Sequence, residues 1–167
     1  MRLLKLMLKK LFESHPALRL AVAESLTGGN VQARVTAESG ASNFFVGGVT
    51  AYTLDQKVAL LGVNRAKAKA SDCVSAEVAR QMARGACKLM KCKIAVATTG
   101  YAEPDRAKGV KVPHAHWAVC HLVGRGKAVF RDGYGEFPGS DREIVQARVS
   151  DEVLAALAKY LESLPEQ

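Results

Sequence analysis

A serine lies where the sequence predicts the change from a strand to a helix. Ser25 follows an apolar run over residues 18–23 that is typical of a buried strand, and residues 30–35 predict the start of a helix. Backbone N–H groups at a helix N-terminus are unpaired and partially positive, so they favour a phosphate or a developing oxyanion. Gly28 and Gly29 would let a ligand approach the backbone closely. Ser25 is therefore a candidate nucleophile, provided that a base takes its proton.

The same turn also has a purely structural interpretation. A serine or threonine before a helix commonly caps it, as Ser25 or Thr27 would do here, and two adjacent glycines commonly form a turn. The segment matches neither the G-x-S-x-G elbow nor the phosphate-binding loop that ends in Gly-Lys-Ser/Thr. The turn alone leaves both interpretations open.

A lysine further along the chain is a candidate base. A lysine can take a serine proton when burial or neighbouring cations lower its pKa, and such a pair hydrolyses amides without histidine. Lys57 lies in a helix predicted over residues 55–61, and Tyr52 ends a strand predicted over residues 44–52. Lysines are mostly exposed, however, so the residues alone favour a solvated helix face for Lys57 over a role as a base.

Histidines and cysteines predict no metal site. His114 and His116 would lie on one face of a strand, but no acidic or cysteine partner has a suitable spacing, so a metal there is the minor alternative. The cysteines form no C-x-x-C pair, which favours reduced thiols and a cytoplasmic location. They are Cys73, Cys87, Cys92 and Cys120.

Composition is that of an ordinary globular protein with a basic balance. The chain has 167 residues, of which 49% are hydrophobic and 24% charged, and this length suits one domain. The formal net charge of +8 admits nucleic acid as a partner, but the cations are scattered and only 6% of residues are aromatic, so we expect no nucleic-acid binding. Residues 1–12 are interrupted by lysines and predict an amphipathic helix on the domain rather than a membrane span, a surface anchor being the minor alternative.

The elements that must position these residues alternate between helix and strand. Further helices are predicted over residues 3–18, 30–37, 64–70, 75–90 and 140–161, the last opened by a capping box of Ser140 and Glu143. Further strands are predicted over residues 93–99, 117–123 and 128–134, the last two joined as a hairpin. This order predicts an α/β fold with three layers, α/β/α, in which helices cover a mixed sheet within a single domain over residues 1–167.

The sequence resembles the C-terminal-domain family of the competence-damage protein CinA. The resemblance runs from about residue 13 to residue 161, in the family's order and at similar spacings. It is carried by Ala23-Glu24-Ser25-Leu26-Thr27-Gly28-Gly29, Gly40-Ala41-Ser42, Tyr52-Thr53-Leu54-Asp55-Gln56-Lys57, Leu61-Gly62-Val63, Val74-Ser75-Ala76-Glu77-Val78-Ala79, Met82-Ala83-x-Gly85-Ala86, Thr99-Gly100 and Pro138-Gly139-Ser140-Asp141-Arg142.

The resemblance implies a compact α/β/α domain that hydrolyses the carboxamide of nicotinamide mononucleotide to nicotinate mononucleotide and ammonia. It implies Ser25 as the nucleophile, Lys57 as the base and Tyr52 as the residue that positions them. It implies neither a metal nor an organic cofactor, and a nucleotide as the small-molecule partner. Family members commonly pair, so a homo-oligomer is expected.

Several further residues are expected to bind the substrate. The N–H groups near Thr27, Gly28 and Gly29 would suit an oxyanion or a phosphate, and Ser42 is a second hydroxyl that would contact the substrate or substitute as nucleophile. Thr99 and Gly100 belong to the same expected site. Arg142 lies at the start of the last helix, where a guanidinium beside a helix N-terminus suits the 5′-phosphate, its alternative being an ordinary surface arginine.

One segment departs from the family pattern. Where the family has glycines after Thr99-Gly100, this chain has Glu103, and a later glycine is replaced by Ala115. Glycine in such a loop supplies special backbone angles or room for a ligand, and a carboxylate near an anionic nucleotide opposes its binding. The alternative function is therefore a catalytically silent or substrate-altered paralogue that binds a nucleotide or a protein partner.

Overall fold

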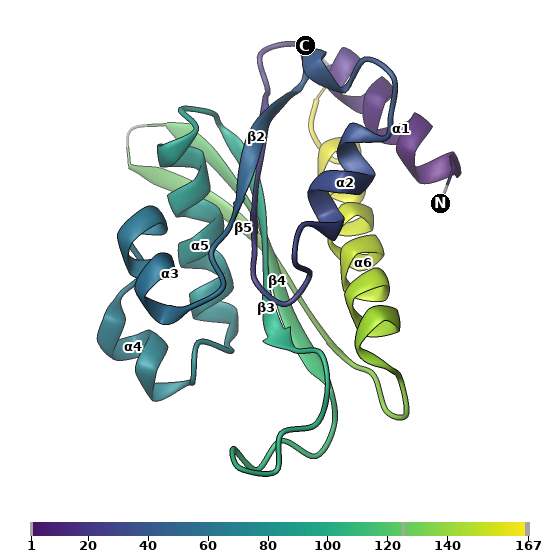
Figure 1. The fold of residues 1–167 in the computed structure, drawn as a ribbon. Coiled ribbons are helices and arrows are strands. Elements are labelled where there is room, and N and C mark those ends of the chain that lie inside the picture. Colours follow the sequence, from purple (N-terminus) through teal and green to yellow (C-terminus); the bar gives the residue numbers. More distant parts are fainter. Residues whose placement is uncertain (1, 125, 166–167) are drawn as a thin grey trace.

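Five strands form one mixed sheet in the order β2-β1-β3-β4-β5 (Figure 1). The structure, a computed structural model, describes residues 2–124 and 126–165. β1 runs parallel to both of its neighbours, β2 and β3, whereas β4 is antiparallel to β3 and β5 is antiparallel to β4. The strands are β1 (Leu20–Glu24), β2 (Phe45–Thr50), β3 (Ile94–Tyr101), β4 (His114–Gly124) and β5 (Lys127–Glu136).

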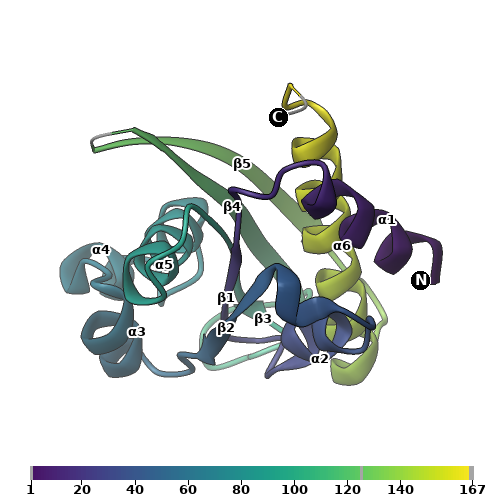
Figure 2. The ribbon, with the colours of Figure 1, turned by 90° about the horizontal axis from the view of Figure 1, so that it is seen from above.

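Helices cover both faces of this sheet. α1, α2 and α6 lie on one face, and α3, α4 and α5 lie on the other (Figures 1 and 2). The expected α/β/α arrangement with a mixed sheet is therefore confirmed. The helices are α1 (Arg2–Glu13), α2 (Asn30–Thr36), α3 (Leu54–Leu61), α4 (Arg65–Ala70), α5 (Ala76–Leu89) and α6 (Arg142–Glu162), and a short 3₁₀ helix, η1 (Ala41–Asn43), precedes β2.

Large and small side chains alternate along the central strands. Successive strand residues point to opposite faces, so the large residues of β1 and β3 face α1, α2 and α6, whereas their alanines face α5. The large set is Leu20, Val22, Ile94 and Val96, and the small set is Ala21, Ala23, Ala95 and Ala97. The alanine face lets α5 lie close to the sheet, which brings α3 and α4 near the end of β1.

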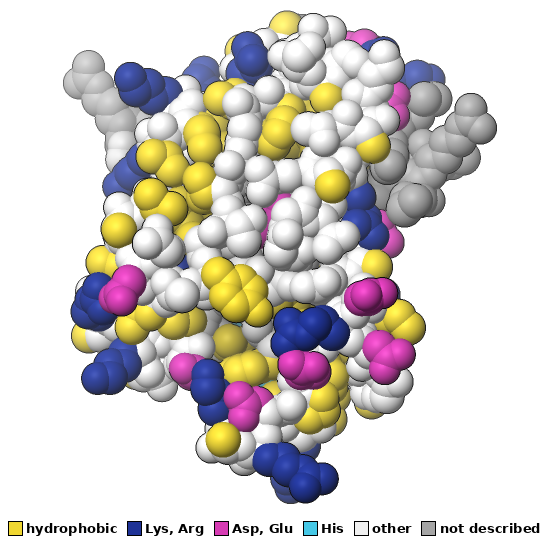
Figure 3. All heavy atoms as spheres, viewed as in Figure 1, with side chains coloured by type: hydrophobic (Ala, Val, Ile, Leu, Met, Phe, Trp, Pro, Cys, Tyr) yellow, Lys and Arg dark blue, Asp and Glu magenta, His cyan; other side chains and the backbone are white. Residues whose placement is uncertain are grey.

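The surface on the α3–α5 side carries exposed apolar side chains. In Figure 3 hydrophobic side chains gather over α5 and β2. Val46 on β2, Leu60 on α3 and Leu89 on α5 are each 39–42% exposed. Among the helices in the described part of the chain, none is long and apolar enough to cross a membrane.

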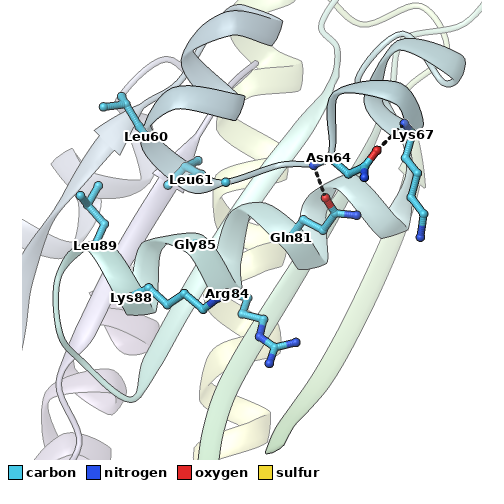
Figure 4. A pocket seen from close by; sticks show the side chains of 10 residues that line it. Leu60, Leu61, Asn64, Lys67, Gln81, Arg84, Gly85, Lys88 and Leu89 are labelled. Carbon is cyan, nitrogen blue, oxygen red and sulfur yellow. Dashed lines mark hydrogen bonds between the residues drawn. The ribbon is translucent and has the colours of Figure 1, made fainter. Parts of the chain in front are cut away.

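α3 and α5 approach each other unusually closely at a glycine. A cavity of about 550 Å³ lies between α3, α4 and α5, and Figure 4 shows Gly85 of α5 in its wall beside Leu61. A Cβ added at Gly85 would lie 2.1 Å from the Leu61 carbonyl oxygen. This separation is far below van der Waals contact, so glycine is required there for the helices to pack.

Most expected elements agree with the structure, with shifted boundaries. α1 ends at Glu13 rather than near residue 18, and β4 begins at His114 instead of Trp117. The expected capping box is wrong, because α6 begins one residue later, with Asp141 in the N-cap position and no side-chain cap bond. Met1, Arg125 of the hairpin turn and residues 166–167 lie outside the described residues.

We expect the substitution Gly85→Ala to destabilise the protein by about 1–3 kcal/mol, because the new methyl group would force α3 and α5 apart. The midpoint of urea denaturation measures this change. Gly124→Ala is the matched control, since an added Cβ at Gly124 meets nothing within 4 Å, and we expect a change within about 0.5 kcal/mol. Equal midpoints for the two variants would contradict this account of the helix contact.

Candidate active site

Ser25 lies at the carboxyl end of β1, where the chain turns toward α2. Its side chain is buried, with 7% of the residue exposed. β1 pairs with β2 on one side and β3 on the other, so the connections leave the sheet in opposite directions at this end. Ligands of open α/β sheets bind at such switch points, beyond the carboxyl ends of the strands.

Lys57 reaches the Ser25 hydroxyl from α3. Its Nζ lies 2.9 Å from Ser25 Oγ, 2.9 Å from the carbonyl oxygen of Ala51 and 3.0 Å from that of Tyr52. As an ammonium group, Lys57 donates one hydrogen bond to each of these oxygens. As a neutral amine, it donates to the two carbonyls, and its lone pair can accept the hydroxyl proton of Ser25. Lys57 can therefore gain or lose a proton without rearrangement.

Burial sets the protonation of Lys57. Only 1% of the residue is exposed, and the loss of solvation lowers the pKa of its amine below the ordinary lysine value. Cys73 and Asp72 act in the opposite direction, Cys73 more strongly, through their charged forms. Desolvation is the largest of these effects, so the site favours the neutral amine more than water does.

The connection between β2 and α3 is fixed to the end of β1. The Ala51 N–H donates to the Glu24 carbonyl oxygen at 2.9 Å, which continues the pairing of β1 with β2. The Thr53 side chain then caps α3 by accepting the Gln56 N–H at 3.3 Å. The carbonyls that hold Lys57 therefore come from a segment tied to the strand that carries Ser25.

Glu24 already occupies the N-terminus of α2. The buried carboxylate accepts the N–H groups of Gly29 at 2.9 Å, Val31 at 3.1 Å and Gln32 at 2.9 Å, together with the Gln32 side-chain amide at 3.1 Å. The Gly28 N–H donates to the Ser25 carbonyl oxygen at 3.1 Å. These contacts correct the expectation that the N–H groups of Gly28 and Gly29 bind a phosphate or an oxyanion.

A backbone N–H group next to Ser25 has no acceptor among the described residues. Among the described residues, the Leu26 N–H has no hydrogen-bond acceptor, and Leu26 lines the cavity at Ser25. Its carbonyl oxygen is held at 2.8 Å by the Gln146 side chain of α6, a residue that sequence reasoning missed. The Leu26 N–H is therefore a candidate donor for stabilising an oxyanion at Ser25.

Thr27 supports the turn from within the core. It is fully buried, and its hydroxyl shares a 2.7 Å hydrogen bond with that of Thr98 on β3. Its side chain therefore joins the turn to the neighbouring strand, and the expectation that the N–H groups near Thr27 bind an oxyanion or a phosphate stays a prediction at this residue.

Ser25 and Lys57 open into a cavity of about 200 Å³. Thr99 lines it, and its hydroxyl donates to the Cys73 carbonyl oxygen at 2.7 Å. This bond holds a turn in which Asp72 and Cys73 both have positive φ, 47° and 65°. Gly100 also lines the cavity, but a Cβ there would lie 2.4 Å from the His114 carbonyl oxygen, so the close approach of β4 alone requires glycine.

A second cavity of about 280 Å³ adjoins the first and contains Arg142. Leu26, Tyr52 and Gly100 are among the residues that line both cavities. The Arg142 guanidinium forms an ion pair with Glu103, and this bond, followed by the Tyr52 side chain, raises the pKa of Arg142. Arg142 thus lies where it can contact the far end of a ligand attached to Ser25.

Tyr52 contacts Lys57 through its main chain and not through its side chain. Its carbonyl oxygen accepts from Lys57, whereas its ring is turned outward, the residue being 57% exposed, and lies beside Arg142. The main chain of Tyr52 therefore positions Lys57, and its phenol belongs to the Arg142 cavity.

Ser42 does not lie at this site. η1 precedes β2, and the Phe44 carbonyl oxygen accepts the Leu20 N–H at the start of β1, whereas Ser25 follows the end of that strand. Ser42 therefore lies beyond the start of β1, whereas Ser25 lies beyond its end. This corrects the expectation of a second hydroxyl in the pocket. His114 and His116 lie among aromatic rings, His116 with its centroid 4.8 Å from that of Tyr134.

Comparisons with known proteins point to one family. The sequence model of the CinA C-terminal domain matches residues 3–161. CinA-like proteins of Picosynechococcus and Chlorobium limicola are 38% identical over 147 residues and 37% identical over 149 residues, covering 86% and 89% of this chain and 34% of each relative. The chain therefore spans about a third of the length of these relatives.

A solved structure shows the same fold. The crystal structure of the competence damage-inducible protein A from Klebsiella pneumoniae superposes with a TM-score of 0.84 over 97% of both chains, at 27% sequence identity. The similarity covers every layer of the domain, including the elements that carry Ser25 and Lys57.

We expect Glu24→Gln to lower the free energy of unfolding by about 1–3 kcal/mol, because a carboxamide has one acceptor oxygen and would leave buried N–H groups of α2 unpaired. Urea denaturation measures the loss. The control is Glu152→Gln, which removes the same charge from an exposed position on α6. Equal stability of the Glu24→Gln variant and the natural protein would show that the carboxylate does not hold the turn.

Proposed function

The chain belongs to the family of the CinA C-terminal domain, and from this membership and the Ser25–Lys57 contact we propose that it is an amidohydrolase. The substrate that the family resemblance implies is nicotinamide mononucleotide, whose carboxamide would be hydrolysed to the carboxylate of nicotinate mononucleotide and ammonia. The reaction needs neither a metal nor an organic cofactor, and it would take place in the cytoplasm.

The observation that carries this proposal is the 2.9 Å contact between a buried amine and a buried hydroxyl. A lysine that merely stabilised the fold would be expected to snorkel to solvent or to pair with a carboxylate. Lys57 instead contacts two carbonyls and a serine, and the pKa of its amine is lowered by burial. These are the surroundings in which an amine serves as a general base.

Acylation follows from this geometry. The neutral amine of Lys57 takes the hydroxyl proton as Ser25 Oγ bonds to the amide carbon, and the carbonyl π electrons move onto oxygen. The Leu26 N–H, which has no acceptor among the described residues and belongs to a residue that lines the cavity, would stabilise the oxyanion. When the oxyanion collapses, the C–N bond breaks and the Lys57 ammonium returns its proton to the departing nitrogen, which leaves as ammonia.

Deacylation reverses these roles with water. Lys57 is neutral again after ammonia leaves, so it takes a proton from a water molecule as the water oxygen attacks the acyl carbon. Collapse of the second tetrahedral intermediate breaks the bond to Ser25 Oγ, which recovers its proton from Lys57. The products are the free hydroxyl and a carboxylic acid, which ionises at neutral pH.

We expect Ser25→Ala and Lys57→Met each to lower kcat for ammonia release from nicotinamide mononucleotide at least about a thousandfold, because each removes one half of the nucleophile–base pair. A coupled assay of ammonia measures this loss, and circular dichroism verifies that the variants are folded.

The matched controls for this pair are Ser42→Ala and Lys69→Ala. Ser42 lies beyond the start of β1, and Lys69 is exposed on α4. Both variants should retain natural turnover. Turnover that survives in Ser25→Ala would exclude Ser25 as the nucleophile, and its absence in the natural protein would contradict the proposed substrate.

The activity should also depend on pH through Lys57. The proton-free amine is the active form, so kcat/KM rises with pH and levels above the Lys57 pKa, with a midpoint below the ordinary lysine value of 10.5. Because Asp72 raises the pKa of Lys57, Asp72→Asn should move this midpoint to lower pH. A pH–rate profile of the two proteins measures the shift, and a midpoint that moves upward would refute the assignment of the base.

A further inference from the structure

Arg142 is occupied by a carboxylate of the same chain. Its guanidinium forms an ion pair with Glu103, which belongs to the segment between β3 and β4. The bond holds the pKa of Glu103 below its usual range, so the carboxylate is ionised at neutral pH. Both side chains remain about half exposed, 43% for Arg142 and 57% for Glu103, and therefore accessible to a ligand in the adjoining cavity.

The position of this pair suits a phosphate of the substrate. The cavity with Arg142 adjoins the cavity with Ser25, so an amide at Ser25 would extend its distal group toward the guanidinium. Phosphate and carboxylate are recognised by a guanidinium through the same fork of N–H donors. A substrate phosphate must therefore displace Glu103 or bind beside its negative charge.

We propose that Glu103 is a specificity-determining residue that competes with the substrate phosphate for Arg142. This inference rests on the proposed amidohydrolase function for its reaction, and it concerns which carboxamide the site accepts. The natural protein would gain little from the phosphate of a mononucleotide, so the corresponding nucleoside, which lacks this phosphate, would be bound and hydrolysed with similar efficiency.

The charges around the two cavities support this competition. Apart from Lys57, three cations and three carboxylates line them: Arg106, Lys108 and Arg142 against Asp72, Glu103 and Asp105. Lys108 is itself paired with Asp72 at 2.6 Å. The cavities therefore carry no surplus of positive charge that would attract a dianionic phosphate. In Figure 3, positive and negative side chains alternate at this lower end of the molecule.

The segment that carries Glu103 is anchored on both sides of the cavities. Its tip is closed by two backbone hydrogen bonds between Asp105 and Val110, at 3.0 and 2.8 Å. Lys108 ties the tip to Asp72 and lies over the Tyr101 ring, with Nζ 5.5 Å from the centroid. Glu103 is thus presented to Arg142 by a defined loop.

The test compares two ligands that differ only in the phosphate, nicotinamide mononucleotide and nicotinamide riboside. Binding is measured by calorimetry on the Ser25→Ala protein, which cannot turn them over, with and without Glu103→Gln. We expect Glu103→Gln to strengthen mononucleotide binding about tenfold, the equivalent of about 1.4 kcal/mol, and to change riboside binding less than twofold. The ratio of kcat/KM values for the two ligands in the active protein should shift by the same factor.

Two further variants separate competition at Arg142 from a general change in charge. Glu143→Gln removes the same charge from an exposed neighbour of Arg142, and no partner for Glu143 is found in the described part of the chain. This variant should leave the ratio of the mononucleotide and riboside affinities unchanged. If Glu103 acts through Arg142, the gain from Glu103→Gln should disappear in an Arg142→Gln background.

These experiments test the role of Glu103 separately from the amidohydrolase function. An unchanged affinity ratio in Glu103→Gln, a gain that persists without Arg142, or a failure of both ligands to bind would overturn the role of Glu103. Loss of mononucleotide binding in Arg106→Gln but not in Arg142→Gln would also overturn it, because the phosphate would then lie on Arg106. If the affinities change as expected but neither ligand releases ammonia in the natural protein, the amidohydrolase function is refuted. The competition between Glu103 and the phosphate for Arg142 would still stand.

Discussion

The burial of one amine constrains the geometry of this domain. Lys57 has 1% of its surface exposed, so its nitrogen must find all of its hydrogen-bond partners within the protein. It finds them on two segments, the turn after β1 and the connection between β2 and α3. The parallel pairing of β1 with β2 brings these segments to one edge of the sheet, and the cap of α3 aims the lysine back toward them.

The same edge is held by a second buried charge, which sequence reasoning left without a role. Glu24 ends β1 with its carboxylate on the N-terminus of α2, so the protein itself supplies the anion that such a helix end attracts. The turn that carries Ser25 is therefore fixed from both sides, by the strand before it and by the helix after it. The N-terminus of α2 is therefore already occupied by a carboxylate of the chain itself, and the guanidinium of Arg142 on α6 is a separate candidate for contacting an anionic group.

The segment after β3 lines both cavities at this end of the sheet. Pairing with β4 positions Gly100. The chain then forms a loop in which Glu103 pairs with Arg142 of one cavity and Lys108 pairs with Asp72 of the other. This is the region in which the sequence departs from the family pattern, while the Ser25–Lys57 contact is present. The departure therefore bears on the choice of substrate more directly than on the chemistry at Ser25.

The sequence by itself determined the layers of the fold and the position of Ser25 between a strand and a helix, because these depend on local patterns. The apolar runs over residues 18–23 and 93–99, and the helical spacing of apolar residues over 75–90, predict elements whose faces must be buried. Only the tertiary structure decided which side chains contact Ser25 and Arg142. The contact of Lys57 with Ser25 spans 32 residues, and the contact of Arg142 with Glu103 spans 39 residues. These contacts, and the separation of Ser42 from Ser25, depend on the order of the strands in the sheet. Side-chain periodicity carries no information about such long-range contacts, since they are set by the packing of elements that are distant in the chain.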